Sequence, residues 1–389
     1  MDATWIHLLL FVSLICVSVR ICSNFCTIQT IYSVTILPFD YNVSFRCIFN
    51  IFYSQVGSSQ NVYQLNDGNE IPVVALGTSL GHLANGTRIL SVNHSVARVV
   101  QWALESGYRH IDTATLYQVE DDVGLGVASY LKDNNATRTS VYITTKLWND
   151  AHDREAVPVA LRQSLKELHL DYVDLYLIHF PFAYEKDGYT ISKTDYLTTW
   201  KGMEDVKDLN LTRSIGVSNF NLTQMQRLWD KSRIKPAVLQ IEINPTIIQE
   251  ELVKWCHDHG VVVMAYSPFG GILGRKSDAP PPRADDPLLV NLSKKYNKTV
   301  SQVLLRYLLD RKLIPIPRSI SKDHIENNID IFDFNLTPEE VDQLSQFNSD
   351  YQLRTRNYIK WYRHPYFPYL KLNVTDAEIQ AVIDSIKGD

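Results

Sequence analysis

The residues best suited to chemistry are an acid, a tyrosine, a lysine and a histidine, namely Asp112, Tyr117, Lys146 and His179. A tyrosine has an ordinary pKa of about 10, so it is a poor acid at neutral pH unless a nearby cation stabilises its phenolate. Lys146 would be that cation and Asp112 its ion-pair partner, while a neutral His179 imidazole would orient a substrate oxygen. The set suits protonation of a carbonyl oxygen during hydride transfer. The hydride must come from a cofactor, because no side chain can supply one.

Other reaction classes lack their residues in this chain. It has no pair of carboxylates at the spacing that glycoside hydrolysis requires. His257 and His259 lie two residues apart on a predicted helix, so they do not share a face, and no other metal-ligand spacing stands out. We therefore expect no metal.

The elements that must position these residues are short β-rich runs alternating with amphipathic helical segments from Asn61 onward. Asn66 to Asn69 predicts a hairpin turn between two short strands. Eight strands are predicted after it: 73–77, 108–112, 141–146, 173–179, 214–218, 237–242, 261–267 and 313–317. Eight such units predict an α/β fold, a (β/α)8 TIM barrel with an N-terminal β-hairpin cap and a long C-terminal loop. The alternative, a doubly wound open sheet, would need a Gly-x-Gly-x-x-Gly turn after the first strand, where the chain reads TSLGHLANG.

Polar side chains stand where the predicted strands end. They are Asp112, Lys146, His179, Ser218, Asn219, Gln240, Tyr266, Ser267, Arg318 and Ser319. Barrel active sites lie at the C-terminal ends of the strands, and buried polar groups cost free energy unless they are paired. We therefore expect these side chains to converge on one rim. The alternative is a set of separate, solvated strand ends.

Composition describes a globular chain of 389 residues with 45% hydrophobic residues. The net charge of −5, with no stripe of Lys and Arg, makes nucleic acid an unexpected partner. The expected partner is a small-molecule carbonyl substrate, and the expected state is a monomer.

The N-terminal region differs from the rest. Residues 1–20 hold a short apolar run, which is typical of a signal peptide, although no Lys or Arg precedes it. The alternative is a short, uncleaved membrane anchor. Residues 21–60 form an extension to which we assign no role. Four of the five cysteines lie before residue 50, so no disulfide framework is expected in the barrel of residues 61–389.

Ten Asn-x-Ser/Thr triplets occur, against about three expected by chance from the composition. Their asparagines are Asn42, Asn85, Asn93, Asn135, Asn210, Asn221, Asn291, Asn297, Asn335 and Asn373. Some have a local explanation, since Thr337 before Pro338 and Glu340 predicts a helix N-cap. The excess predicts a glycosylated protein that is secreted or resides in the secretory lumen. A cytoplasmic location is the alternative.

The segments GYRHIDTATLYQVEDDVG, TTKLW, LIHFP, GVSNF, LQIEIN, AYSPFG and IPRS follow one another in the chain. In this order they resemble the aldo-keto reductase superfamily, over roughly Tyr63 to Tyr369. The resemblance is closest to secreted insect-type members that reduce 3-dehydroecdysone.

The resemblance implies an NADPH cofactor bound without a Rossmann domain. It makes Tyr117 the general acid, Lys146 and Asp112 the groups that tune it, and His179 the residue that positions the substrate. Ser218, Asn219 and Gln240 would hold the carboxamide, and Tyr266 would stack on the nicotinamide. It further assigns to the cofactor Thr78, Ser267, Arg318, Ser319, His324 and Asn328.

The chain departs from the family pattern at positions assigned to the cofactor and at positions assigned to the substrate. Arg318 replaces a usual lysine and His324 a usual arginine at the positions that recognise the 2′-phosphate, so the preference for NADP over NAD is less secure. Ser79, Trp148 and Phe180 would line the substrate site. Phe180 is typical of members that reduce steroids, and the aromatic segment from His364 to Leu370 adds apolar surface.

Two functions therefore remain open at this point. The first is NADPH-dependent reduction of an aldehyde or ketone, either a steroid-like ketone such as 3-dehydroecdysone or a general range of carbonyls. The second is a catalytically silent barrel acting as a secreted carrier, which would be expected to lack one of Tyr117, Lys146 and His179.

Overall fold

The structure is a computed structural model of the chain. It describes residues 61–81, 88–188, 190–274, 281–349, 361–369 and 375–387. The expected leader of residues 1–20 and the extension of residues 21–60 lie outside the described residues. Within these ranges, no helix has the length and apolar content needed to cross a bilayer.

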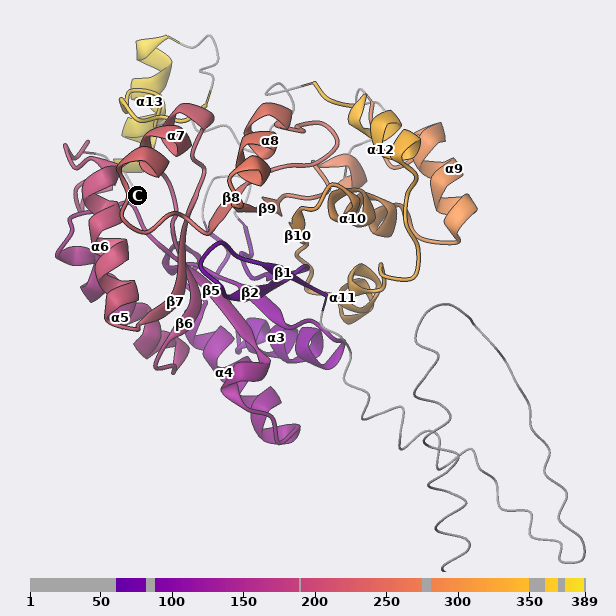
Figure 1. Cartoon of the computed structure of the whole chain (residues 1–389), viewed down its shortest axis with the longest axis horizontal. Coiled ribbons are helices and arrows are strands. Elements are labelled where there is room, and N and C mark those ends of the chain that lie inside the picture. The colour runs from indigo at the N-terminus through magenta and orange to yellow at the C-terminus, as the bar shows by residue number, and fades with distance from the viewer. Residues whose placement is uncertain are drawn as a thin grey trace, which may run out of the picture. The chain divides into compact units, whose positions relative to one another are not determined.

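Eight parallel strands follow one another around a barrel in chain order (Figure 1). They are β3 (Leu76–Gly77), β4 (His110–Asp112), β5 (Tyr142–Leu147), β6 (Val173–Ile178), β7 (Thr212–Ser218), β8 (Val238–Glu242), β9 (Val262–Tyr266) and β10 (Ile314–Ile316). Between the two outermost strands, the Ala75 amide donates to the Pro315 carbonyl over 3.1 Å and the Gly77 amide to the Pro317 carbonyl over 2.9 Å. The (β/α)8 prediction is confirmed. The open doubly wound sheet is excluded, because its strand order reverses at a switch point.

Strand alternation divides the core into two apolar layers. In β6, Leu175 and Leu177 belong to the cluster inside the barrel, whereas Tyr176 and Ile178 belong to the cluster between strands and helices. All six residues of β6 are buried. A strand buried on both faces reads as a continuous apolar run, which is why the sequence shows these strands without clear alternation.

The predicted hairpin is present as β1 (Val62–Gln64) and β2 (Glu70–Pro72), which pair antiparallel. Ile71 is buried in the interior cluster. The Asn66 side chain donates to the carbonyl of Pro236, which precedes β8, over 2.9 Å. The hairpin therefore covers the N-terminal end of the barrel and leaves the opposite rim open to ligands.

Helices surround the strands (Figure 1). Those in the described residues are α3 (Ser95–Glu105), α4 (Glu120–Asp133), α5 (Ala156–Leu168), α6 (Tyr196–Asp208), α7 (Leu222–Lys231), α8 (Glu250–Asp258), α9 (Pro287–Tyr296), α10 (Val300–Asp310), α11 (Lys322–Ile329), α12 (Pro338–Ser345) and α13 (Asp376–Lys387). Thr337 caps α12 in a capping box with Glu340, as predicted. Part of the expected C-terminal loop, residues 361–369, is described, and it contributes to the site below.

Candidate active site

Strand ends deliver three of the four predicted catalytic residues to one rim. Asp112 is the last residue of β4, Lys146 is the second-last residue of β5, and His179 follows β6 directly. From the sequence alone Tyr117 would be expected to begin the helix that follows β4, but the structure places it before α4 (Glu120–Asp133). It ends a short 3-10 turn (Thr115–Tyr117), and Gln118, with φ 56°, breaks the helical path before α4 begins.

The Lys146 ammonium joins the acid to the tyrosine. Its Nζ lies 2.6 Å from Asp112 Oδ1, 2.8 Å from the Thr113 carbonyl oxygen and 3.4 Å from the Tyr117 hydroxyl. The other carboxylate oxygen, Asp112 Oδ2, accepts from Gln240 Nε2 over 2.7 Å. The predicted association of these residues, some of them more than a hundred positions apart in the chain, is present.

Lys146 is fully buried, and its surroundings decide its charge. Burial by itself lowers the pKa of the ammonium, but the Asp112 carboxylate and the Tyr117 phenol outweigh it and raise the pKa above its ordinary value. Lys146 is therefore protonated at neutral pH. A fixed positive charge beside the phenol favours the phenolate that remains after proton donation.

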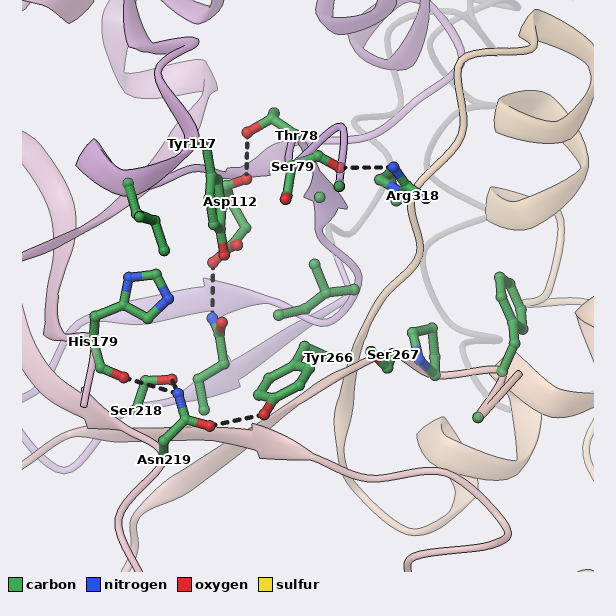
Figure 2. Close-up of a pocket in the computed structure, with 18 of the residues that line it drawn as sticks. Thr78, Ser79, Asp112, Tyr117, His179, Ser218, Asn219, Tyr266, Ser267 and Arg318 are labelled. Carbon is green, nitrogen blue, oxygen red and sulfur yellow. Dashed lines mark hydrogen bonds between the residues drawn. The ribbon is translucent and has the colours of Figure 1, made fainter. Parts of the chain in front are cut away.

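His179 faces Tyr117 across the same space (Figure 2). The two rings meet edge to face with centroids 5.8 Å apart, and Phe180 stacks on the imidazole at 5.3 Å. Trp148 contacts the imidazole edge to face at 5.2 Å. Aromatic neighbours on several sides thus fix the orientation of a ring that is 6% exposed.

A cavity of about 430 Å³ opens beside these residues. It is lined by Gly77, Thr78, Ser79, Gly81, Arg88, Asp112, Leu116, Tyr117, His179, Phe180, Ser218, Asn219, Gln240, Tyr266, Ser267, Pro268, Phe269, Gly270, Gly271, Leu273, Gly274, Ile316, Arg318 and Trp361. Most of the polar strand-end residues named from the sequence are in this set. The alternative of separate, solvated strand ends is therefore wrong.

One wall of the cavity combines amides with an aromatic ring. The Asn219 side chain donates to the His179 carbonyl oxygen over 2.8 Å and accepts from the Tyr266 hydroxyl over 2.8 Å (Figure 2). The Tyr369 hydroxyl, from the C-terminal segment, donates to the same Asn219 oxygen. Ser218 and Gln240 line the cavity next to it. This wall fits an aromatic ring that carries an amide, such as nicotinamide, because it offers hydrogen-bonding side chains beside the flat ring of Tyr266.

The opposite end of the cavity is cationic. The Arg318 guanidinium lines it and donates from Nη1 to the Ser79 carbonyl oxygen over 3.0 Å (Figure 2). Thr78 lines the cavity too, but its hydroxyl donates to the Asp112 carbonyl oxygen over 3.0 Å and so also joins β3 to β4. Together, the amide wall and the cationic end fit an extended, anionic nicotinamide dinucleotide.

Three residues assigned to the cofactor lie outside this cavity. The Ser319 hydroxyl bonds to Ser321, while His324 is exposed and Asn328 is buried on α11. Ser319 follows Arg318 directly in the chain, and His324 and Asn328 lie on the next helix.

Two of the three residues that the sequence predicts at the substrate site are in the wall of the cavity. Ser79 and Phe180 line the cavity, whereas Trp148 lies behind it, edge to face with Phe180 at 6.3 Å. Sequence reasoning missed Trp361, which lines the cavity and contacts Phe180 edge to face at 4.9 Å. No spacing pattern links residue 361 to a strand end, so only the aromatic character of this C-terminal region was a signal.

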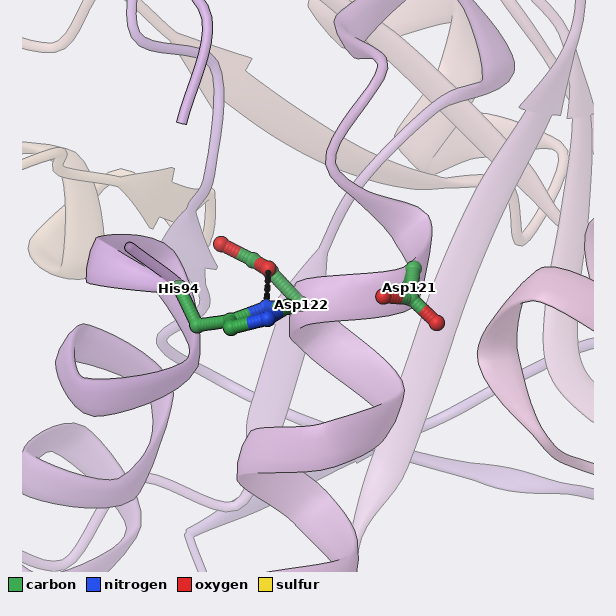
Figure 3. A group of neighbouring side chains, drawn as sticks. All are labelled: His94, Asp121 and Asp122. Atoms are coloured by element: carbon green, nitrogen blue, oxygen red, sulfur yellow. Dashed lines mark hydrogen bonds and ion pairs between the residues drawn. The ribbon is translucent and has the colours of Figure 1, made fainter. Parts of the chain in front are cut away.

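A second cluster of ionisable side chains, His94, Asp121 and Asp122, has ligand atoms within 4.8 Å of one another (Figure 3). Asp122 accepts from His94 Nδ1 over 2.7 Å and from the Val96 amide over 3.3 Å. Asp121 accepts from His169 Nε2 over 2.9 Å. The bonds of Asp122 join α4 to the start of α3, and the bond of Asp121 joins α4 to His169 at the end of α5, so each side chain of the cluster has a partner within the protein.

Known proteins resemble this chain over the whole barrel. The family model of the aldo/keto reductase family matches residues 76–349. Aldo-keto reductase AKR2E4 of Bombyx mori is 53% identical over 306 residues, which cover 78% of this chain and 97% of the relative. Estradiol 17 beta-dehydrogenase 5 of Mus musculus is 35% identical, and the alignment covers 80% of this chain and 98% of the relative.

Solved structures of similar proteins contain a nicotinamide dinucleotide cofactor. The crystal structure of Bombyx mori AKR2E4 in complex with NADP is 51% identical, with a TM-score of 0.74, and covers 79% of this chain and 98% of that one. The crystal structure of silkworm AKR2E5 complexed with NADPH is 38% identical, with a TM-score of 0.76, and covers 81% and 95%.

Proposed function

Because the chain belongs to the aldo/keto reductase family and is an NADPH-dependent reductase of carbonyl compounds, we propose that Tyr117 is the general acid of its reaction. The observation that carries this proposal is the 3.4 Å approach of the buried Lys146 ammonium to the Tyr117 hydroxyl. A carrier barrel would have no need of a buried cation at this place.

Bound NADPH supplies the hydride to the carbonyl carbon. The Tyr117 O–H bond breaks as the O–H bond of the product alcohol forms, and the phenolate that remains is stabilised by Lys146. Asp112 holds Lys146 in place and protonated. His179, fixed by its aromatic neighbours, orients the carbonyl oxygen toward the phenol. Ser218 and Gln240 would bind the carboxamide and Tyr266 would flank the nicotinamide.

The proposed substrate is a polycyclic ketone of steroid type, such as 3-dehydroecdysone. Phe180 and Trp361 give the cavity an apolar wall, and Ser79 leaves room on the side next to β3. The similarity to a relative named estradiol 17 beta-dehydrogenase 5 supports a steroid-like substrate. Simple aldehydes are the competing substrate class.

A steady-state assay of NADPH oxidation tests the proposal, with a ketosteroid and a simple aldehyde offered separately. Replacing the acid in Tyr117→Phe should lower turnover by about 10²- to 10⁴-fold, the usual contribution of a general acid. NADPH affinity should stay nearly unchanged. The matched control is Tyr172→Phe, which should keep full turnover, because Tyr172 precedes β6 at the end of the strand opposite the rim and its hydroxyl accepts from Arg213 there. Undiminished turnover in Tyr117→Phe removes Tyr117 from the acid role.

Tight NADPH binding by the unaltered chain, without oxidation of NADPH in the presence of either substrate, would support the function of a carrier protein instead.

We further propose that the protein passes through the secretory pathway and carries N-linked glycans. Six triplet asparagines in the described residues are exposed, namely Asn93, Asn135, Asn210, Asn291, Asn297 and Asn335. Asn221 differs, because its side chain caps α7 and donates to the Pro368 carbonyl oxygen over 3.1 Å. A glycosidase should therefore increase the gel mobility of protein secreted by cultured eukaryotic cells. Asn210→Gln should remove one glycan and Asn221→Gln none. A secreted chain that does not shift contradicts the proposal.

A further inference from the structure

Residues 361–369 of the C-terminal region reach the active site at two points. The Trp361 ring lines the cavity and contacts Phe180, and the Tyr369 hydroxyl donates to the side-chain oxygen of Asn219. The shape of the substrate wall therefore depends on what holds this segment against the barrel.

The N-terminal ends of α6 and α7 hold the segment between those two points. The Tyr366 hydroxyl donates to Asp195 Oδ2 over 2.9 Å, and Gln224 Nε2 donates to the Tyr366 carbonyl oxygen over 2.9 Å. Asn221 Nδ2 donates to the Pro368 carbonyl oxygen over 3.1 Å. Asn221 and Gln224 also form the capping box of α7, so the helix sets their positions.

Hydrogen bonds within the segment connect Tyr366 to Trp361. The Tyr366 amide donates to His364 Nδ1 over 3.1 Å, and the His364 amide donates to the Trp361 carbonyl oxygen over 2.9 Å. Because Nδ1 accepts, the imidazole proton is on Nε2, which donates to the Ala183 carbonyl oxygen over 3.1 Å. A displacement of Tyr366 is therefore passed on to Trp361.

Asp195 has the largest number of bonds at this attachment. It is the N-cap of α6, where its Oδ1 accepts from the Leu197 amide over 2.8 Å. The Arg227 guanidinium donates to both carboxylate oxygens, over 2.9 and 2.6 Å. Burial raises the pKa of the Asp195 carboxyl, but the bonds from Arg227, Leu197 and Tyr366 outweigh burial and lower the pKa below its ordinary value. The carboxylate is therefore ionised at neutral pH, which strengthens its bond to the Tyr366 phenol.

Resting on the proposed reduction of a ketosteroid, we propose that Asp195 and Arg227 are positioning residues that act through Tyr366. They hold residues 361–369 so that Trp361 stays beside Phe180 in the substrate wall. Loss of the attachment should weaken the binding of a polycyclic ketone that spans this wall. A simple aldehyde is too small to depend on it.

Tyr366→Phe tests the proposal, because it removes one hydroxyl and keeps the ring that packs edge to face on Tyr196. KM for a ketosteroid should rise by about two- to fivefold, part of the effect of a lost bond to a charged group. The kcat value, KM for a simple aldehyde and the dissociation constant of NADPH should stay nearly constant. Arg227→Gln removes the ion pair and should show the same pattern.

The matched control is Tyr296→Phe on α9. The Tyr296 hydroxyl donates to Glu340 Oε2 over 2.6 Å, and Lys295 pairs with the same carboxylate at 2.6 Å, so a phenol, a carboxylate and a cation are arranged as at Asp195. This change should affect stability and leave KM for both substrates constant.

A double-mutant cycle shows whether Tyr366 acts through Trp361. In the Trp361→Ala background, Tyr366→Phe should raise KM for the ketosteroid much less than it does in the unaltered chain. The full effect in both backgrounds contradicts the proposal, and so does an equal rise of KM for the ketosteroid and the aldehyde.

Hydrogen exchange measured by mass spectrometry on the NADPH-bound chain separates this proposal from the proposed function, because it needs no turnover. Amides of residues 361–369 should exchange faster in Tyr366→Phe than in the unaltered chain and in Tyr296→Phe. Unchanged exchange in Tyr366→Phe overturns the proposal. Faster exchange in a chain that reduces no ketosteroid would support the attachment of the segment and refute the steroid substrate.

Discussion

The sharpest test of the catalytic geometry removes the Lys146 ammonium beside Tyr117. The test must not leave the buried Asp112 carboxylate without a partner. Lys146→Met alone would strand the Asp112 carboxylate, which is 3% exposed, and losing one partner of a buried ion pair costs about 3–5 kcal/mol of stability. The double change Lys146→Met with Asp112→Asn removes both charges. An asparagine at position 112 keeps an oxygen that can accept from Gln240.

The expected loss follows from the distance between the ammonium and the phenol. Across 3.4 Å, a unit charge stabilises a phenolate by about 5 kcal/mol at an effective dielectric constant of about 20. Tyr117 is half-buried, so water screens part of this interaction and about 2–3 kcal/mol remains. Since each 1.36 kcal/mol is tenfold in rate, kcat should fall by about 30- to 150-fold.

Single-turnover oxidation of bound NADPH is the appropriate assay, because slow product release can hide a change in the chemical step. Fluorescence quenching by NADPH and far-ultraviolet circular dichroism establish that the double variant folds. The matched control is the ion pair between Arg138 and Asp174, 2.7 Å apart, replaced by Met and Asn. That change should affect stability but not the single-turnover rate. A folded double variant at Lys146 and Asp112 that retains a rate within about threefold of the unaltered chain refutes the role of the ammonium.

Three other predictions concern stability and the substrate wall. Gly216→Ala should lower the free energy of unfolding by about 1–3 kcal/mol in urea titrations, because the new Cβ would lie 2.4 Å from the Val238 carbonyl oxygen. Burial lowers the pKa of His152 to about 3 from 6.5, so its protonation favours the unfolded chain and stability falls as pH decreases below about 6.5. His152→Phe should make the slope of unfolding free energy against pH shallower by about 1.4 kcal/mol per pH unit between pH 6 and 4, and an unchanged slope would contradict the assignment. Trp361→Ala removes an aromatic contact with Phe180, so KM for a ketosteroid should rise by about two- to tenfold while the dissociation constant of NADPH stays constant.

Sequence reasoning was most successful where the information is local. A buried strand that ends in a polar residue is visible in a few letters, as at Asp112 and Lys146, and the repetition of such strands predicts a barrel whose strand ends share a rim. The turn at Tyr117 was less predictable. A left-handed residue at Gln118 separates it from α4, and glutamine is not a residue that marks such a conformation.

The barrel, its hairpin cap and the residue types at the open rim could therefore be predicted from the amino-acid sequence, because hydrophobic runs and strand termini are properties of neighbouring residues. The 3.4 Å between Lys146 and Tyr117 and the presence of Arg88 and Trp361 in the cavity wall became visible only in the folded chain. These depend on how loops from distant parts of the chain close over the same rim, and loop paths leave no periodic pattern in the sequence.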